Sequence, residues 1–223
     1  MKIAIRFGHC VGGDYGAVGL LDEFKEIREY GPYAVSTLLR HGVEVVNVTP
    51  ETCVNPYNGV FQGIDKANAE NVDLFISLHI NSFTSPDGNG ATVLHAQGSV
   101  EGSMLAQSIL NKISSLGFAN RGLMPKTGFW ELDSTDAWAV IVEPFFVSSP
   151  KDVDLYRKIG AEKLGEAIAK GILEYAGVEF VPTQNLDMVP RAELDKANAR
   201  IAEVTNMYYT LLGKVINLGK EFA

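Results

Sequence analysis

The sequence has little of the material that marks membrane or secreted proteins. None of its apolar runs approaches the roughly 20 consecutive residues that a membrane-spanning helix needs. The opening residues, MKIAIRFG, are too short an apolar stretch for a signal peptide. We therefore expect synthesis in the cytoplasm without a signal peptide, and no membrane insertion.

Positive charge is also in short supply, with 19 Lys and Arg against 27 Asp and Glu and a net charge of −8. Because nucleic-acid binders neutralise phosphates with surplus cations, this balance argues against nucleic acid as a partner. It gives equally little reason to expect binding to an anionic membrane surface.

Cysteine is scarce as well, since the chain has only Cys10 and Cys53. Two cysteines do not make the disulfide framework of a small secreted domain. Cys10 directly follows His9, and adjacent residues on an extended chain point apart. We therefore interpret Cys10 as a small apolar filler beside a site rather than as a metal ligand.

What the chain has in quantity is apolar sequence, 46% of its 223 residues, which is enough to bury a full core. Short apolar runs alternate with longer stretches of helical periodicity, a pattern typical of α/β proteins. We predict that residues 1–177 form a single twisted, mostly parallel six-stranded sheet covered by helices on both faces. Pro32 predicts a kink or a split in the first helix. The predicted strands are 2–7, 42–48, 72–81, 91–96, a shorter one near 129–132, and 137–146; the predicted helices are 23–40, 58–71, 101–116 and 149–175.

The C-terminal part has a different pattern. Residues 178–189 are typical of a linker, and apolar residues then recur in an a/d heptad pattern over residues 190–223. This pattern predicts one amphipathic helix, which must bury its apolar stripe somewhere. It either self-associates, which would make the protein a homo-oligomer, or folds back on the main domain.

Three predicted strands finish in polar side chains that metal ions or substrates use. The strand at 72–81 turns polar at His79 and Asn81, the first strand is followed by His9, and the last carries Glu143 near its end. In open α/β sheets, ligands bind beyond the carboxyl ends of the strands. We therefore expect these side chains to meet in one site.

His9, Glu23 and His79 make a plausible metal set, because two imidazoles and one carboxylate leave a fourth position for water, as in catalytic zinc sites. Glu143 would handle protons beside that water. A histidine after a strand is more often a turn residue than a metal ligand. Glu23 could serve only to stabilise the positive end of a helix dipole. Glu143 is harder to dismiss, because a carboxylate within an apolar run needs a cation, a metal or a raised pKa.

Six short motifs, in order, resemble those of one enzyme family. They are Gly8-His9-Cys10, the loop from Gly12 to Gly19, Asp22-Glu23, Ser77-Leu78-His79-Ile80-Asn81, Arg121-Gly122, and Ile141-Val142-Glu143-Pro144-Phe145-Phe146. Over about residues 2–175 the chain resembles the zinc-dependent N-acetylmuramoyl-L-alanine amidases of the Amidase_3 family, and most of all their phage endolysin branch. Glu26 and Glu29 are nearby rivals of Glu23. Cys10 departs from the family, which commonly has glycine there.

The resemblance implies a Zn²⁺ ion held by His9, Glu23 and His79, with Glu143 as the catalytic glutamate. It implies cleavage of the amide bond between N-acetylmuramic acid and L-alanine in the peptidoglycan of a Gram-positive cell wall. Asn81 and, in the Arg-Gly motif, Arg121 become candidate substrate-binding residues. It further implies a phage lysin that reaches the wall after release by a holin.

Other interpretations stay open at this point. The same fold could carry another zinc peptidase or a non-catalytic cell-wall-binding module, and residues 190–223 could target the wall instead of forming oligomers. A nucleotide-binding protein is a poor fit, because the loop at 12–19 lacks the GxGxxG spacing. Phe129, Trp130 and Trp138 could line a groove for glycan or serve only in packing.

Overall fold

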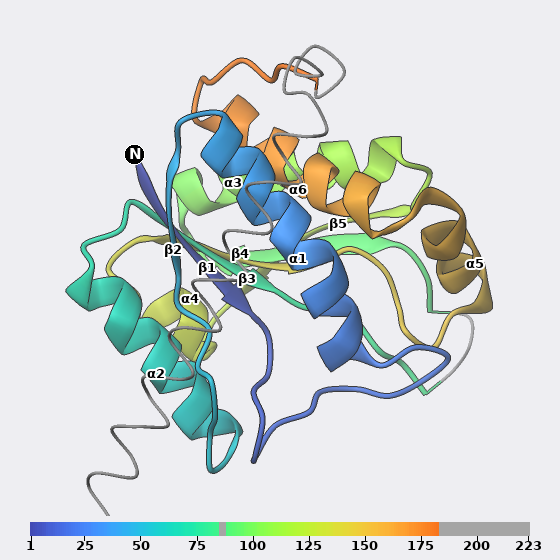
Figure 1. Cartoon of the computed structure of the whole chain (residues 1–223), viewed down its shortest axis with the longest axis horizontal. Helices are drawn as coiled ribbons and strands as arrows, with labels where there is room; N and C mark the ends of the chain where they lie inside the picture. Colours follow the sequence, from blue (N-terminus) through green and yellow to red (C-terminus); the bar gives the residue numbers. More distant parts are fainter. Residues whose placement is uncertain (85–87, 183–223) are drawn as a thin grey trace, which may run out of the picture. The chain divides into compact units, whose positions relative to one another are not determined.

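The structure is a computed structural model that describes residues 1–84 and 88–182. Its centre is a six-stranded sheet with the strand order β2-β1-β3-β6-β4-β5 (Figure 1). The strands are β1 (Lys2–Phe7), β2 (Glu44–Asn47), β3 (Leu74–Leu78), β4 (Ala91–Ala96), β5 (Asn120–Lys126) and β6 (Trp138–Glu143). The helices are α1 (Glu23–Arg40), α2 (Pro56–Ala69), α3 (Val100–Ser115), α4 (Trp130–Asp133), α5 (Pro150–Ile159) and α6 (Ala161–Tyr175).

The predicted mostly parallel sheet is confirmed. Strands β2, β1, β3 and β6 run parallel, whereas β4 pairs antiparallel with β6 and parallel with β5. The register aligns Phe7 with Leu78, and Leu78 with Val142. Residues that follow these three positions in the chain therefore emerge at the same edge of the sheet.

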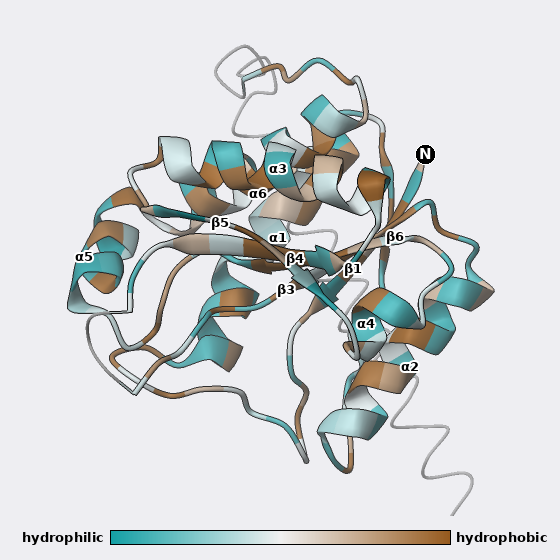
Figure 2. Ribbon diagram, turned by 180° about the vertical axis from the view of Figure 1, so that it is seen from behind, coloured by the Kyte–Doolittle hydropathy of each residue, from teal (hydrophilic) through white to brown (hydrophobic). Residues whose placement is uncertain are grey.

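Side chains alternate between the two faces of each strand, so the sheet has a core on each side. Ile3, Ile5 and Ile76 belong to the larger core, together with apolar residues of α1, α3 and α6. Ala4 and Phe75 point the other way, into a smaller core with residues of α2 and α4. Figure 2 shows the apolar strands between these two helical layers, which confirms the prediction of helices on both faces.

Two predictions about elements, and one of two predicted alternatives, were wrong. The strand predicted near residues 129–132 is the short helix α4, and β5 precedes it. Gly128, at φ +76°, turns the chain there, and its N–H donates to Asp133 Oδ2 at 2.6 Å. The helix predicted from 149 to 175 is divided into α5 and α6 by Gly160 at φ +84°. Helix α1 is continuous despite Pro32, so the predicted alternative of a split is wrong.

Cys10 is buried, as expected of a small apolar filler, but the interpretation was incomplete, because Cys10 also forms a disulfide with Cys53. Their Cα atoms are 5.9 Å apart, and the bridge ties the loop after β1 to the segment before α2. Gly59 on α2 lets this helix approach: a Cβ there would lie 2.6 Å from Cys10 Sγ. The bridge thus fixes the residue that follows His9.

In the part of the chain that the structure describes, every helix is too short or too polar to cross a membrane. Val178 and Phe180 pack against the larger core, beyond the predicted boundary at 177. Most of the predicted linker, and the whole of the helix predicted at 190–223, lie outside the described residues.

Candidate metal centre

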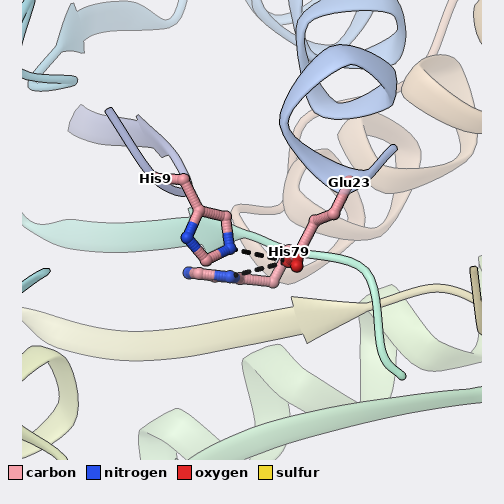
Figure 3. Close-up of side chains that lie close together, drawn as sticks. All are labelled: His9, Glu23 and His79. Atoms are coloured by element: carbon pink, nitrogen blue, oxygen red, sulfur yellow. Dashed lines mark hydrogen bonds and ion pairs between the residues drawn. The ribbon is translucent and has the colours of Figure 1, made fainter. Parts of the chain in front are cut away.

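His9, Glu23 and His79 come together at the carboxyl edge of the sheet. Their candidate ligand atoms lie within 4.8 Å of one another. Glu23 Oε1 is 3.0 Å from His9 Nε2 and 3.1 Å from His79 Nδ1, as the dashed lines in Figure 3 show. The structure therefore brings together the three residues predicted as metal ligands.

Each of these side chains is held by its own element. His9 follows β1 with φ at +66°, a left-handed conformation that is uncommon outside glycine and is often found at functional sites. Glu23 occupies the first turn of α1, which Asp22 caps. The backbone N–H groups of Ala17 and Ile80 donate to its two carboxylate oxygens at 2.8 and 2.9 Å. His79 follows β3, and its N–H donates to Val142 O at 2.9 Å.

Two glycines leave room for the ligand atoms. A Cβ at Gly16 would lie 2.7 Å from His9 Nε2 and 2.8 Å from Glu23 Oε2. A Cβ at Gly8 would lie 2.8 Å from His79 Nδ1. These glycines belong to the first two motifs noted in the sequence, so part of what those motifs encode is space around the histidines and the glutamate.

The electrostatics favour a carboxylate at the centre of the group. Burial alone would raise the pKa of Glu23, but hydrogen bonds and charge from His79 and His9 outweigh burial and hold that pKa well below its usual range. Burial would lower the pKa of His9, yet Glu23 and Asp14 together raise it. His9 and Glu23 therefore favour each other's charged forms.

The donor set fits zinc. Two imidazole nitrogens and one carboxylate are the protein ligands of many catalytic zinc sites. His9 Nε2 is buried and faces Glu23 Oε1 at 3.0 Å, so these two atoms can bind the same ion. The other ring nitrogens face carboxylates, as is usual for metal-bound histidines. His9 Nδ1 is 2.7 Å from Asp14 Oδ1, and His79 Nε2 is 3.8 Å from Glu131 Oε2.

Glu143 ends β6 near the three candidate ligands. Asn81 Nδ2 donates to Glu143 Oε2 at 2.5 Å, so the structure supplies the partner that a buried carboxylate needs. Burial raises the pKa of Glu143, the charge of His79 opposes this, and the charge of Glu23 adds to the rise. These interactions place Glu143 within electrostatic range of the centre.

Arg121 lies on β5, an edge strand of the sheet. Its Nη1 donates to Asn89 O at 3.2 Å, and its guanidinium carbon is 5.0 Å from the ring centroid of Phe146. Its charge acts to lower the pKa of Glu143, as does that of Lys126. The structure therefore puts Arg121 at the periphery of the site, on the side of Glu143.

Sequence reasoning missed Glu131, a buried residue of α4. Glu131 Oε1 accepts hydrogen bonds from Arg6 Nη1 at 2.9 Å and from Ser77 Oγ at 2.7 Å. Its other oxygen faces His79. A signal was present in Arg6, because an arginine within an apolar strand must find a buried anion. The partner lies 125 residues further along the chain, where a strand had been predicted.

The sequence profile of the Amidase_3 family, N-acetylmuramoyl-L-alanine amidase, matches residues 3–174. The chain belongs to this family. Among solved structures, this amidase-family chain resembles the catalytic domain of the CD27L endolysin targeting Clostridia Difficile, with a TM-score of 0.71 and 28% identity over 78% of this chain and 97% of that one. It also resembles the N-acetylmuramoyl-L-alanine amidase AmiC2 of Nostoc punctiforme, with a TM-score of 0.69 and 29% identity over 79% of this chain and 97% of that one.

Two curated relatives of this amidase-family chain are longer than it is. An uncharacterized 38.4 kDa protein of Clostridium perfringens is 38% identical over 211 residues, which cover 89% of this chain and 60% of the relative. An uncharacterized protein of Clostridium perfringens strain 13 is 33% identical over 180 residues, 78% of this chain and 52% of the relative. The chain thus spans between half and two thirds of these relatives.

Proposed function

We propose that the chain is a zinc-dependent peptidoglycan amidase, which hydrolyses the amide bond between the lactyl group of N-acetylmuramic acid and L-alanine of the stem peptide. The observation that carries this proposal is the convergence of His9, Glu23 and His79 beside Glu143. The family membership and the two amidase structures described above support the same reaction.

His9 Nε2, Glu23 and His79 Nδ1 would hold a zinc ion. When bound, this ion would act as a Lewis acid toward both the amide carbonyl and a water molecule. The protein's own part of the reaction belongs to Glu143. Its raised pKa suits a group that takes a proton from the attacking water and passes it to the leaving amine of L-alanine. Asn81 fixes one oxygen of this carboxylate, so we assign the proton transfer to the other.

Arg121 is a proposed substrate contact. Its charge is felt at Glu143, so an anionic group of a stem peptide bound near the reacting amide would be attracted to it. A role as a phage lysin for Gram-positive walls, with release by a holin, is a further part of the proposal, supported by the similarity to an endolysin catalytic domain. Self-association or wall targeting through residues 190–223 is proposed from the heptad pattern alone.

The test is hydrolysis of purified Gram-positive cell walls, scored by the appearance of new N-terminal alanine. We expect these amines with the wild type and not after treatment with a zinc chelator or with Glu143→Gln. Glu51→Gln, which changes an exposed glutamate outside the centre, should behave as the wild type. Release of single amino acids without new alanine termini would instead indicate a zinc peptidase. Wall binding without any cleavage would indicate a binding module.

A further inference from the structure

An exposed aromatic cluster lies on the surface formed by α2 and α4. It consists of Tyr57 and Phe61 from α2 and Trp130 from α4, with ring centroids 5.0 and 5.3 Å from that of Trp130. Tyr57 is 61% exposed and Trp130 42% exposed. Large aromatic side chains in contact with one another and with solvent are unusual on a surface without a partner.

The cluster borders a hollow of about 240 Å³, which we call the aromatic hollow, lined by Val60, Gly128, Phe129, Trp130 and Glu131. This hollow adjoins the metal centre through Glu131, whose Oε2 lies 3.8 Å from His79 Nε2. Lys126 gives a second link. Its ammonium is 5.7 Å from the ring centroid of Phe129, and its charge is felt at Glu143.

A second hollow, of about 450 Å³, lies on the other side of the centre, and its lining includes Ala17, Val18, Ser82, Phe83 and Thr84. It is linked to the centre through Ala17, whose N–H donates to Glu23 Oε2. Ala17 packs against the larger core, on the face of the sheet that carries α1.

The aromatic hollow belongs to the opposite face of the sheet. Leu132, the residue after Glu131, is part of the smaller core beneath α2 and α4. The two hollows therefore flank the metal centre from opposite faces. A substrate with two parts that meet at the scissile bond, such as a glycan strand and a stem peptide, would place one part, or arm, in each hollow.

We propose that the aromatic hollow binds a sugar ring of the glycan strand, and that the stem peptide occupies the hollow beside Val18 and Phe83. This inference rests on the proposed amidase function. A pyranose ring has flat, apolar C–H faces, and such faces fit the exposed ring of Trp130 and its aromatic neighbours. The charged group in the lining of the aromatic hollow, the carboxylate of Glu131, is paired with Arg6, so the hollow presents mainly apolar and aromatic surface, which suits a neutral sugar.

The second hollow has the lining that an extended peptide needs. Apolar surface from Val18 and Phe83 lies beside the hydroxyl groups of Ser82 and Thr84, so side chains and backbone amides of a peptide would both find partners. With this assignment, the two hollows fix the direction in which the muramoyl-alanine bond crosses the centre.

The test compares Trp130→Ala with a matched tryptophan variant. Trp138 is 50% exposed and begins β6, at the opposite end of the strand from Glu143, and it is not part of the lining of the aromatic hollow. Of the two alternatives left open for Trp138, a place in a glycan groove or packing, its position outside the aromatic hollow favours packing. Trp138→Ala serves as the control, and Trp130→Phe serves as the conservative variant. Unchanged zinc binding by all three variants would show that the centre is intact.

The first readout is binding of a neutral N-acetylglucosamine tetrasaccharide, followed by amide chemical shifts. The second is KM and kcat on glycan-bearing muramoyl-peptide substrate. We expect Trp130→Ala to weaken binding and raise KM by roughly tenfold, the scale of losing one aromatic stack, with kcat changed less than twofold. Trp130→Phe should recover most of the loss, and Trp138→Ala should match the wild type.

Three results would overturn the inference. In the first, an active wild type and Trp130→Ala have the same KM and the same affinity for the tetrasaccharide. In the second, Trp130→Ala loses affinity for the free stem peptide instead, which would reverse the two arms. In the third, the wild type binds no tetrasaccharide. If the wild type binds the tetrasaccharide through Trp130 but cleaves no wall, the proposed amidase function fails while the sugar-binding hollow stands.

Discussion

Replacing Glu131 by glutamine should weaken zinc binding without changing any proposed ligand. The carboxylate of Glu131 accepts from Arg6 and Ser77 and faces the ring nitrogen of His79 that points away from Glu23. Glutamine keeps the size of the side chain and one acceptor oxygen but removes the charge. His79 then loses the anion that supports its ring, and outer partners of this kind are worth about 10–100-fold in metal affinity.

Stability should fall in the same variant. The Arg6–Glu131 pair is buried, with the arginine side chain 1% and the glutamate side chain 9% exposed. Removing one member of a buried pair typically costs about 3–5 kcal/mol, because the other charge stays buried without its partner. Arg6 Nε and Nη2 already lack hydrogen-bond partners among the described residues. Few neighbouring groups could therefore offset the cost of the unpaired arginine charge.

The assay is zinc titration against a competing chelator, together with urea unfolding of the metal-free protein. The double variant Arg6→Met with Glu131→Gln is the decisive control, because it also removes the arginine charge that Glu131→Gln leaves unpaired. We expect it to recover stability and to remain weak in zinc binding. Glu44→Gln, which breaks only an exposed ion pair with Lys2, should change stability by less than about 0.5 kcal/mol. Wild-type zinc affinity in Glu131→Gln would refute the role assigned to Glu131.

Three further outcomes are expected. Gly16→Ala should abolish zinc binding, because its Cβ would collide with His9 and Glu23, whereas Gly98→Ala, also at positive φ but with nothing within 4 Å, should bind zinc normally in the same titration. Burial raises the folded-state pKa of Glu143, so the stability that this group contributes is complete below its unfolded pKa of 4.5 and is lost as pH rises through the folded pKa. Metal-free Glu143→Gln should accordingly gain stability over the wild type between pH 4 and 8 in urea unfolding, and an unchanged difference would contradict the burial argument. Reduction of the Cys10–Cys53 bridge, which closes a separation of 43 residues, should lower the free energy of unfolding by about 4 kcal/mol, and the Cys10→Ser, Cys53→Ser double variant should be insensitive to reductant.

The proposed ligands could be found from the sequence because a local sequence pattern, such as an apolar strand or a helix N-cap, precedes each of them. His9 and His79 come directly after apolar strands, and the parallel register then brings strand ends to one edge. Glu23 follows a good N-cap residue, Asp22, at the start of a helix. Glu143 stands out as a carboxylate within an apolar run, and such a group demands a partner.

Glu131, the disulfide and the aromatic hollow depend on contacts that no local pattern encodes. The sequence around Phe129 and Trp130 has the aromatic content of a strand. The turn at Gly128 starts a short helix there instead. Cys10 and Cys53 meet because Gly59 lets α2 pack closely against them. The separation of Trp130 from Trp138 likewise follows from the path of the chain across the sheet and not from their spacing.

The central claim, a zinc amidase built on His9, Glu23 and His79, is tested most directly by titrating metal-free protein with zinc while counting new N-terminal alanine from purified cell walls. The account predicts that the rate rises in proportion to added zinc and saturates at one ion per chain, with no rise in Glu143→Gln. A rate independent of zinc, or zinc bound at this stoichiometry without any alanine amines, would contradict it.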